Sequence, residues 1–167
     1  MKTLKNYLFI VVLFSLTIPA LCQESIASKT GSSADLNKNI TIIDGLYKAF
    51  AVGDIPAVLG SLDSKIVWNE AEGNAYADGN PYIGPDAVLN GVFGRLGADH
   101  EYFNLKNIEL HEMSNDKVLA TLRYDAKFKN GKSYDAQAAH LWTLKDGKVV
   151  AFQQYVDTKK LNDALNN

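Results

Sequence analysis

The chain has 167 residues, 47% of them hydrophobic and 22% charged, and a net charge of −2 at pH 7. These values are typical of one globular domain and exclude a largely disordered or collagen-like chain. The charge offers no basic surface for nucleic acid or anionic membrane, and we expect neither as a partner. The single cysteine excludes a disulfide framework, and the three histidines lack metal-ligand spacing. We therefore expect no metal and no cofactor.

The N-terminus has the pattern of a secretory signal peptide. Lys2 and Lys5 precede an apolar run over residues 7–18, which is too short to span a bilayer comfortably. Ala20 and Cys22 place small residues at the −3 and −1 positions of a cleavage site after Cys22. We therefore expect an exported protein, periplasmic or secreted, with no membrane contact after cleavage.

Cleavage at this site divides the chain into three parts. Residues 1–22 are the signal peptide, residues 23–38 a flexible linker rich in Ser, Lys, Asn and Gly, and residues 39–167 the folded domain. The alternative is a lipoprotein with Cys22 lipidated. Leu21 disfavours it, because lipoprotein signals take a small residue before the cysteine.

Helical patterns come first in the domain, and strands follow. The expected elements before residue 99 are a helix over 40–50, a helix after Asp54 that extends to Leu62, a strand over 65–70, a loop over 71–85 and a helix over 85–96. The later ones are strands over 103–114, 117–129, 132–145 and 148–158, and a helix over 159–165. This order predicts an α+β fold, a bent antiparallel sheet packed on N-terminal helices.

Two hairpin turns predict which residues of the strands are neighbours. Asn130-Gly131 and Asp146-Gly147 are strong signals for two-residue turns, which fix the register. The expected neighbours are Thr121, His140 and Gln153 in one row, Arg123, Ala138 and Tyr155 in the next, and Asp125, Ala136 and Asp157 in the third. A β-bulge would change this assignment.

Alternation then gives the sheet a polar and an apolar face. The apolar face collects Val118, Ala120, Leu122, Tyr124, Ala126, Phe128, Leu141, Val150, Phe152 and Val156. In one interpretation this face is the core and the polar face meets solvent. In the other, the polar face lines a pocket floored by Ala136 and Ala138, and the apolar face forms a homodimer interface.

Several short segments together resemble a known family. They are Tyr47-Lys48-Ala49-Phe50 with Gly53-Asp54, Ile66-Val67-Trp68, Tyr82-Ile83-Gly84-Pro85-Asp86-Ala87-Val88, His140-Leu141-Trp142-Thr143, Gly147-Lys148-Val149-Val150 and Tyr155-Val156-Asp157-Thr158. In this order they make residues 40–165 similar to the NTF2-like, or SnoaL-like, α+β cone. The resemblance implies a conical pocket between sheet and helices, with His140 pointing into it.

The resemblance does not decide the reaction, because one fold hosts many functions. The family includes ketosteroid isomerases, polyketide cyclases, epoxide hydrolases, dehydratases and non-enzymatic binding proteins. Ketosteroid isomerase-like members carry acids at the position of His140 and near Asn69, and this chain has neither acid. Limonene epoxide hydrolase-like members carry Arg-x-Asp, a second Asp and an Asn, to which Arg123-Tyr124-Asp125, Asp157 and Asn69 are similar.

The residues themselves suggest roles in acid–base chemistry. Asp157 and His140 are the candidates for proton transfer, with Arg123 and Asp125 tuning the charge. The ligand-binding candidates are Asn69, Trp68, Tyr82, Phe93, Trp142, Gln153 and Tyr155. Each has an alternative that is purely structural: an ion-pair cluster for the charged groups, a hydrogen-bonded wall position for His140, and core packing for the aromatic residues.

Other polar residues are expected to be ordinary surface groups: Glu70, Glu72, His100 and His111. Two hypotheses about function remain. The first is an exported, cofactor-free enzyme that acts on a hydrophobic carbonyl or epoxide compound. The alternative is a non-catalytic module that binds an apolar small molecule.

Overall fold

The structure, a computed structural model, describes residues 33–166 of the chain. In chain order the elements are α1 (Ser33–Ala51), α2 (Ile55–Gly60), β1 (Leu62–Asn69), η1 (Ala75–Gly79), β2 (Tyr82–Ile83), α3 (Pro85–Val88), η2 (Leu89–Phe93), α4 (Gly94–Asp99), β3 (His100–Met113), β4 (Lys117–Phe128), β5 (Ser133–Lys145), β6 (Lys148–Val156) and α5 (Thr158–Asn166). None of the helices within these residues is long and apolar enough to cross a membrane. The expected signal peptide and most of the expected linker lie outside the described residues.

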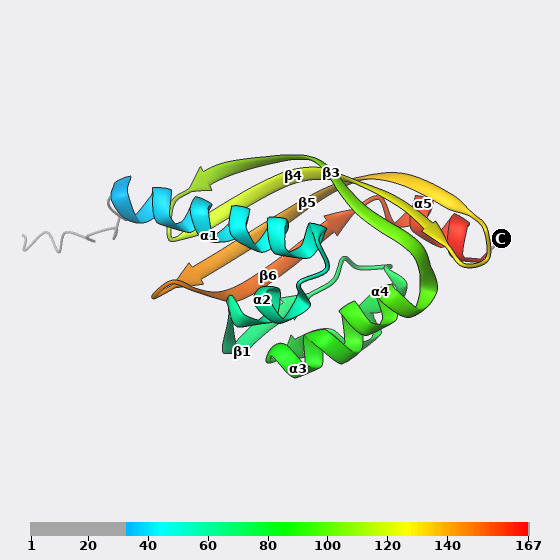
Figure 1. Cartoon of the computed structure of the whole chain (residues 1–167), viewed down its shortest axis with the longest axis horizontal. Coiled ribbons are helices and arrows are strands. Elements are labelled where there is room, and N and C mark those ends of the chain that lie inside the picture. Colours follow the sequence, from blue (N-terminus) through cyan, green and yellow to red (C-terminus); the bar gives the residue numbers. More distant parts are fainter. Residues whose placement is uncertain (1–32, 167) are drawn as a thin grey trace, which may run out of the picture.

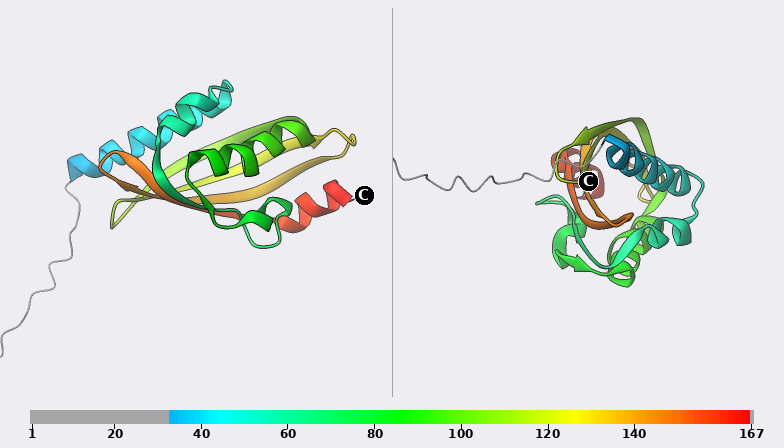
Figure 2. Two further views of the ribbon diagram at one scale, coloured as in Figure 1. Left: turned by 90° about the horizontal axis from the view of Figure 1, so that it is seen from below. Right: turned by 90° about the vertical axis from the view of Figure 1, so that its left-hand side faces the viewer.

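A curved sheet of six strands forms one layer, and α1 to α4 cover one of its faces (Figure 1). The strand order is β2-β1-β6-β5-β4-β3. Seen from one end, the sheet curls towards the helices (Figure 2). This confirms the expected α+β cone. The sheet is mixed rather than antiparallel, however, because β1 runs parallel to β6.

The helices differ from expectation in three places. One is α2, which ends at Gly60, so that Leu62 begins the strand β1 instead. The first helix, α1, begins at Ser33, inside the stretch assigned to the linker, and no glycine or proline stands between Ser33 and Ile40 to end it. The expected third helix is continuous from Pro85 to Asp99, but its middle, η2, is a π-helical turn. Wider turns of this kind often occur beside functional sites.

The β4–β5 hairpin has a different register from the one expected. Lys129, Asn130 and Gly131 form a three-residue loop, since the Phe128 N–H donates to the Lys132 carbonyl over 2.9 Å. Gly131 has a φ of +89°, as the last residue of such a loop requires. His140 therefore lies opposite Ala120 instead of Thr121, and the expected register was wrong by one residue.

The β5–β6 hairpin keeps the expected turn and then shifts. Asp146 and Gly147 both have positive φ, and Lys145 pairs with Lys148 as expected. Val150 is then left unpaired as a bulge, so that Thr143 pairs with Ala151. Beyond the bulge His140 lies opposite Gln154, and the expected pairing with Gln153 was wrong.

These two register shifts decide which residues of neighbouring strands share the buried face of the sheet. Every second residue of β4, from Val118 to Phe128, is buried together with every second residue of β5, from Tyr134 to Leu144. Most of the predicted homodimer face is therefore part of the core of a single chain, in one hydrophobic cluster with buried side chains of α1, α2 and α3. The argument that placed a dimer interface on that face was wrong.

Candidate functional site

An apolar cavity lies between the sheet and the helices, at the place the family resemblance implied. The space open to the centre of a water-sized sphere is about 50 Å³, enough for a few water molecules. Its apolar wall is formed by Leu46, Phe50, Val58, Trp68, Val92, Phe93, Leu96, Phe103, Leu105, Trp142, Phe152 and Leu161. The polar side chains that line it are Tyr47, Glu70, Asn74, Tyr76, Tyr124, Tyr134, His140 and Gln154.

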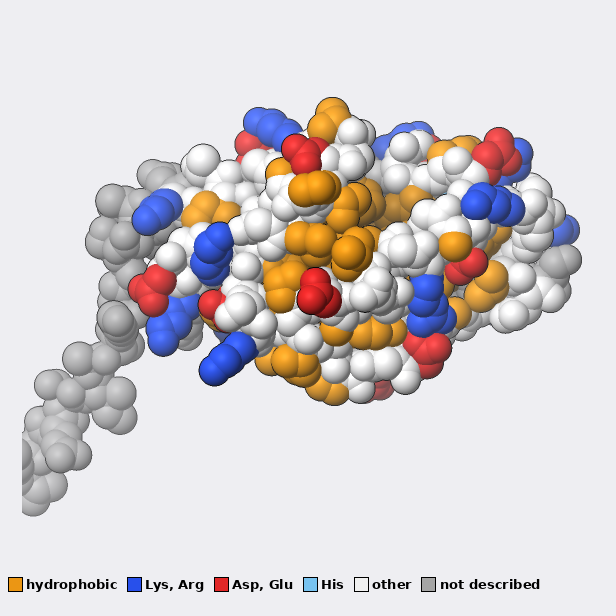
Figure 3. Space-filling view, turned by 60° about the horizontal axis from the view of Figure 1, so that its bottom comes forward, with side chains coloured by type: hydrophobic (Ala, Val, Ile, Leu, Met, Phe, Trp, Pro, Cys, Tyr) orange, Lys and Arg blue, Asp and Glu red, His pale blue; other side chains and the backbone are white. Residues whose placement is uncertain are grey.

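The cavity opens between α1, η2, α4 and β3. Three of these elements each contribute a half-buried aromatic ring: Phe50, Phe93 and Phe103. The centroid of the Phe50 ring lies 6.0 Å from that of Phe93 and 6.3 Å from that of Phe103. Figure 3 shows hydrophobic side chains gathered in a hollow on this side of the molecule, with charged groups around it. A ligand that enters here first meets aromatic surface.

His140 occupies the centre of a chain of hydrogen bonds on the sheet wall. Its Nδ1 lies 2.7 Å from the Tyr47 hydroxyl and its Nε2 lies 2.5 Å from the Tyr124 hydroxyl. The Trp142 indole donates to the Tyr47 oxygen over 3.0 Å, and the Gln154 amide donates to the Tyr124 oxygen over 3.0 Å. Burial lowers the pKa of His140 to about 3, so the ring is uncharged at neutral pH.

Glu70 follows the end of β1 and points into the same cavity. Its side chain is buried with the residue only 2% exposed, and it accepts hydrogen bonds from the Trp68 indole (2.7 Å) and the Asn74 amide (3.1 Å). No Lys or Arg among the described residues forms an ion pair with it. Burial raises the pKa of Glu70 to about 7, although the bond from Trp68 opposes the rise.

Asn74 and Gln154 connect Glu70 to the His140 chain. The Asn74 amide donates both to Glu70 and to Gln154 Oε1, the second over 2.8 Å. The backbone N–H of Ala71 also donates to Gln154 Oε1, and that of Tyr76 to Asn74 Oδ1. These backbone donors fix which way each amide faces, so the connection has one orientation.

A second histidine lies near the other end of the cavity. The His100 Nδ1–H donates to the Leu96 carbonyl over 3.1 Å, and Tyr134 donates to His100 Nε2 over 3.0 Å. His100 is 5% exposed and stacks on Phe128. The expectation of a surface histidine was wrong here, because β3 starts at His100 and turns the ring into the core.

Four of the predicted site residues line the cavity: His140, Trp68, Phe93 and Trp142. Tyr82 is buried elsewhere, with its ring against Gly79 and Gly91 and its hydroxyl donating to the Tyr76 carbonyl. Asn69, Gln153 and Tyr155 are on the other side of the sheet, and Tyr155 is 53% exposed. The structure thus divides the predicted ligand-binding set among the cavity, a separate buried position and the outer face of the sheet.

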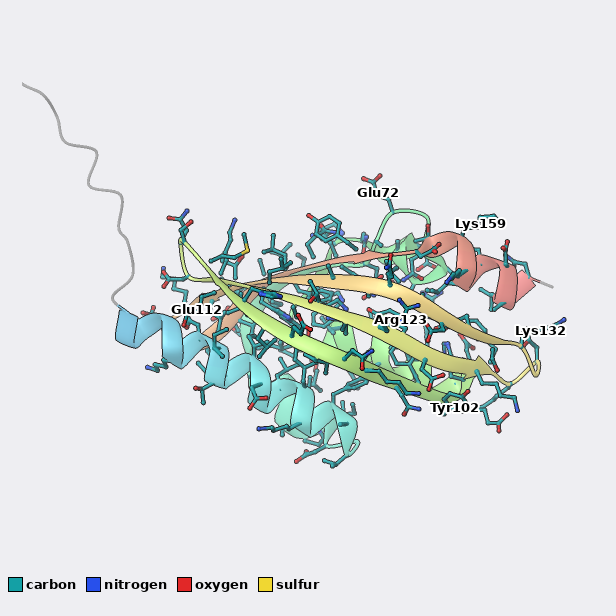
Figure 4. All side chains as sticks on the ribbon, turned by 90° about the horizontal axis from the view of Figure 1, so that it is seen from above. Glu72, Tyr102, Glu112, Arg123, Lys132 and Lys159 are labelled. Carbon is teal, nitrogen blue, oxygen red and sulfur yellow. The ribbon has the colours of Figure 1, made fainter. Side chains whose placement is uncertain are left out.

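Arg123 and Asp125 lie on the outer face of β4 because of the one-residue register shift. Arg123, labelled in Figure 4, pairs with Asp135 through its Nε at 2.6 Å, and Asp125 pairs with Lys106. The predicted grouping of Arg123 with Asp125 and Asp157 around His140 is therefore absent. These two ion pairs agree with the structural alternative for the charged residues, an ion-pair cluster.

Asp157 stands directly before α5 and faces solvent. Its carboxylate accepts a hydrogen bond from the Lys160 backbone N–H over 3.3 Å, the contact of a helix-capping residue. The geometric argument for proton transfer by Asp157 therefore no longer holds. The hydrogen bond gives Asp157 a structural role at the start of α5.

The sequence interpretation missed Glu70, although a signal for it was present. Ile66 and Trp68 point inward, and the two-residue period of a strand puts Glu70 on the same side. The same period puts Asn69 on the outside. Tyr124 and Gln154 were missed for a different reason, the register errors at the two hairpins.

The site combines a proton-exchanging carboxyl with neutral hydrogen-bonding groups in an apolar enclosure. A carboxyl with a pKa near 7 exists in both protonation states at neutral pH, as a general acid–base group requires. His140, with a pKa of about 3, is a weak base and is held by two hydroxyls. The geometry therefore favours Glu70 over His140 for moving a proton.

Comparison with known proteins gives the same architecture. A family model described as a SnoaL-like domain matches residues 43–152. Among solved structures, an NTF2-like protein from Burkholderia thailandensis E264 has 29% identity and a TM-score of 0.72, covering 77% of this chain and 98% of its own. Bal32a, from a soil-derived mobile gene cassette, has 19% identity and a TM-score of 0.71, with coverages of 79% and 99%. TerC, co-crystallised with polyporic acid, has 21% identity and a TM-score of 0.70, and the match covers 78% of this chain and 99% of TerC. No curated protein matches the sequence.

Proposed function

Within the SnoaL-like domain family, to which the chain belongs, we propose that this protein is a cofactor-free enzyme that moves a proton on a small apolar molecule. One observation carries the proposal. Glu70 is a buried carboxyl in the cavity, without a cationic partner among residues 33–166, and its pKa is close to 7. Carboxyls with such surroundings serve as proton donors and acceptors at neutral pH.

The reaction class follows from the groups present. Ionised Glu70 takes a proton from a carbon or oxygen of the substrate and returns it at another atom of the same molecule. The proton is conserved and no electrons are gained or lost, so the step needs no oxidant or reductant. Isomerisation, ring closure and dehydration all begin in this way. The aromatic lining favours a small, flat substrate, and the cavity, which has room for only a few water molecules as it stands, must widen to admit it.

A non-catalytic binding module is the second candidate. It is favoured by the hydrogen bonds that Tyr47, His140, Tyr124 and Gln154 form with one another, since side chains that bond one another in this way also serve as a passive wall. A binding protein needs the same apolar enclosure. It does not need a carboxyl that titrates near pH 7.

The test uses 5-nitrobenzisoxazole, a small flat molecule that reports on a buried carboxylate base. Removal of its ring C–H proton opens the ring: the C–N bond becomes a nitrile, the N–O bond breaks, and the oxygen leaves as a coloured phenolate. Turnover should increase as the pH rises through about 7, where Glu70 ionises. Glu70→Gln should reduce kcat at least about a hundredfold.

The matched control is Glu72→Gln, two residues along the chain and exposed (labelled in Figure 4). It should keep the wild-type rate and pH profile. If folded Glu70→Gln keeps the wild-type rate, the active site lies elsewhere. If the wild-type protein binds the probe, shown by a raised melting temperature, but never turns it over, the binding module is the better description.

We also propose that the protein acts after export. The proposal is supported by the basic, apolar and small-residue pattern of residues 1–22. N-terminal sequencing of the protein from its native host should find a chain that begins at Gln23. A diacylglycerol on Cys22 would instead establish the lipoprotein alternative.

A further inference from the structure

The His140 chain contains one hydrogen more than it can use internally. At its two ends the donors are fixed: the Trp142 indole N–H points at the Tyr47 oxygen, and the Gln154 amide N–H points at the Tyr124 oxygen. Gln154 cannot be turned round, because the Ala71 N–H and the Asn74 amide both donate to its Oε1. Both tyrosine oxygens therefore already act as acceptors.

Two gaps remain, one between Tyr47 and His140 and one between His140 and Tyr124. Each gap holds one hydrogen. An uncharged imidazole brings one N–H, and the two tyrosines bring one O–H each, which makes three hydrogens for two positions. The third must belong to a tyrosine hydroxyl, and no other acceptor among the described residues bonds either hydroxyl.

Which tyrosine holds the spare hydrogen depends on the tautomer of His140. With the proton on Nδ1, His140 donates to Tyr47 and accepts from Tyr124, so the Tyr47 hydrogen is spare. With the proton on Nε2, the roles are reversed and the Tyr124 hydrogen is spare. Both tyrosines line the cavity, so in either state the spare hydrogen belongs to a cavity wall residue.

We propose that His140 is a tautomeric relay, which offers one hydroxyl hydrogen to the ligand from either Tyr47 or Tyr124. The ligand class that fits carries an acceptor oxygen, a carbonyl or a phenolate, on an otherwise apolar body. The position of that oxygen selects the tautomer. The inference rests on the proposed function only in that the ligand occupies this cavity, and it does not require Glu70 to react.

The test observes the ring nitrogens of His140 by NMR in the ¹⁵N-histidine-labelled protein, without and with saturating 4-nitrophenolate as an acceptor-only probe. Protonated and unprotonated ring nitrogens resonate at different frequencies, so each tautomer is recognisable. Binding should move His140 towards one tautomer. His100 is the internal control: Leu96 and Tyr134 fix its tautomer, which should not change.

Variants give a second readout. Because the donor can move, Tyr47→Phe and Tyr124→Phe should each bind 4-nitrophenolate with a small loss, while the double variant should lose about tenfold to a hundredfold, as for a hydrogen bond to a charged acceptor. A fixed donor would instead make one single variant as weak as the double.

Three outcomes would overturn the relay. His140 could keep one tautomer on binding, its ring could be doubly protonated, or 4-nitrophenolate could fail to bind at high concentration. A protein that turns over 5-nitrobenzisoxazole through Glu70 but shows a fixed His140 keeps the proposed function and loses the relay. A mobile tautomer without turnover keeps the relay in a binding protein.

Discussion

Glu70 and His140 are buried in the same cavity with pKa shifts of opposite direction. The pKa of Glu70 rises from 4.5 to about 7 on folding, so between these values the folded protein binds more protons than the unfolded chain, and stability falls as pH rises. The pKa of His140 falls from 6.5 to about 3, so its contribution is full above 6.5 and is lost as pH falls. Between pH 4.5 and 6.5 the two slopes oppose each other.

Glu70→Gln should remove the contribution of Glu70 to the pH dependence of stability and leave that of His140. Relative to wild type, the variant's free energy of unfolding should rise by about 3 kcal/mol from pH 4.5 to 7, because one pKa unit corresponds to about 1.4 kcal/mol. Urea denaturation at several pH values measures this difference. Glu72→Gln should run parallel to wild type, and a parallel curve for Glu70→Gln would show that Glu70 titrates normally.

Asp157 should matter for α5 and not for the cavity. Asp157→Ala should lower the free energy of unfolding by about 1 kcal/mol through loss of the helix cap, whereas Asp157→Asn, which keeps a capping oxygen, should stay within a few tenths of a kcal/mol. Both should retain wild-type turnover of 5-nitrobenzisoxazole. A hundredfold loss in Asp157→Asn with an intact fold would restore the original assignment of Asp157 as a catalytic acid or base.

The continuous helix from α3 to α4 packs closely against the ring of Tyr82. A Cβ at Gly91, in the π-helical turn η2, would lie 2.1 Å from Cε1 of the buried Tyr82 ring, whose hydroxyl is held by the Tyr76 carbonyl. Further along, in α4, a Cβ at Gly97 would have no atom within 4 Å. The packing of Tyr82 therefore requires glycine at one position and not at the other.

Two alanine substitutions should then have opposite effects. Gly91→Ala should destabilise the protein by about 1–3 kcal/mol through overpacking, and Gly97→Ala should stabilise it by about 0.5–1 kcal/mol through helix propensity. Thermal and urea unfolding measure both. Equal shifts in the two variants would mean that the Tyr82 ring moves aside without cost.

At the scale of the whole molecule, the outer face of the sheet is the one to which the homodimer prediction now applies. Leu122 lies on the buried face, while Leu141 lies on the outer face, half-buried near Ala139 and the exposed Tyr155. The homodimer stays a prediction, and its interface moves to this outer face. The apolar side chains there are interrupted by the ion pairs of Arg123 and Asp125, so a dimer would be more polar than first expected.

Substitutions on the two faces separate folding from association. Leu122→Glu should unfold the chain, because it buries an unpaired carboxylate. Leu141→Glu should keep the fold and convert a dimer to a monomer, as measured by analytical ultracentrifugation. A wild-type protein that sediments as a monomer would remove the dimer prediction, and a folded, soluble Leu122→Glu would contradict the assignment of the core face.

Patterns within single segments were enough to predict the order of the elements and the α+β class, because helices and strands differ in local periodicity and a strand alternates sides every two residues wherever it stands. The cone, and the direction of His140 into its pocket, were instead implied by the resemblance to the SnoaL-like family. The π-helical turn and the strand β2 were not predicted, because both depend on how residues 71–99 pack against the rest of the chain.

The composition of the site could not be predicted in the same way, because it depends on contacts between segments. One extra residue in the loop at Lys129 exchanged Thr121 for Ala120 beside His140, and one bulge at Val150 exchanged Gln153 for Gln154, since a slip of one residue turns a whole strand over. The pKa of Glu70 depends likewise on the helices and aromatic rings that exclude water from it, which belong to distant parts of the chain.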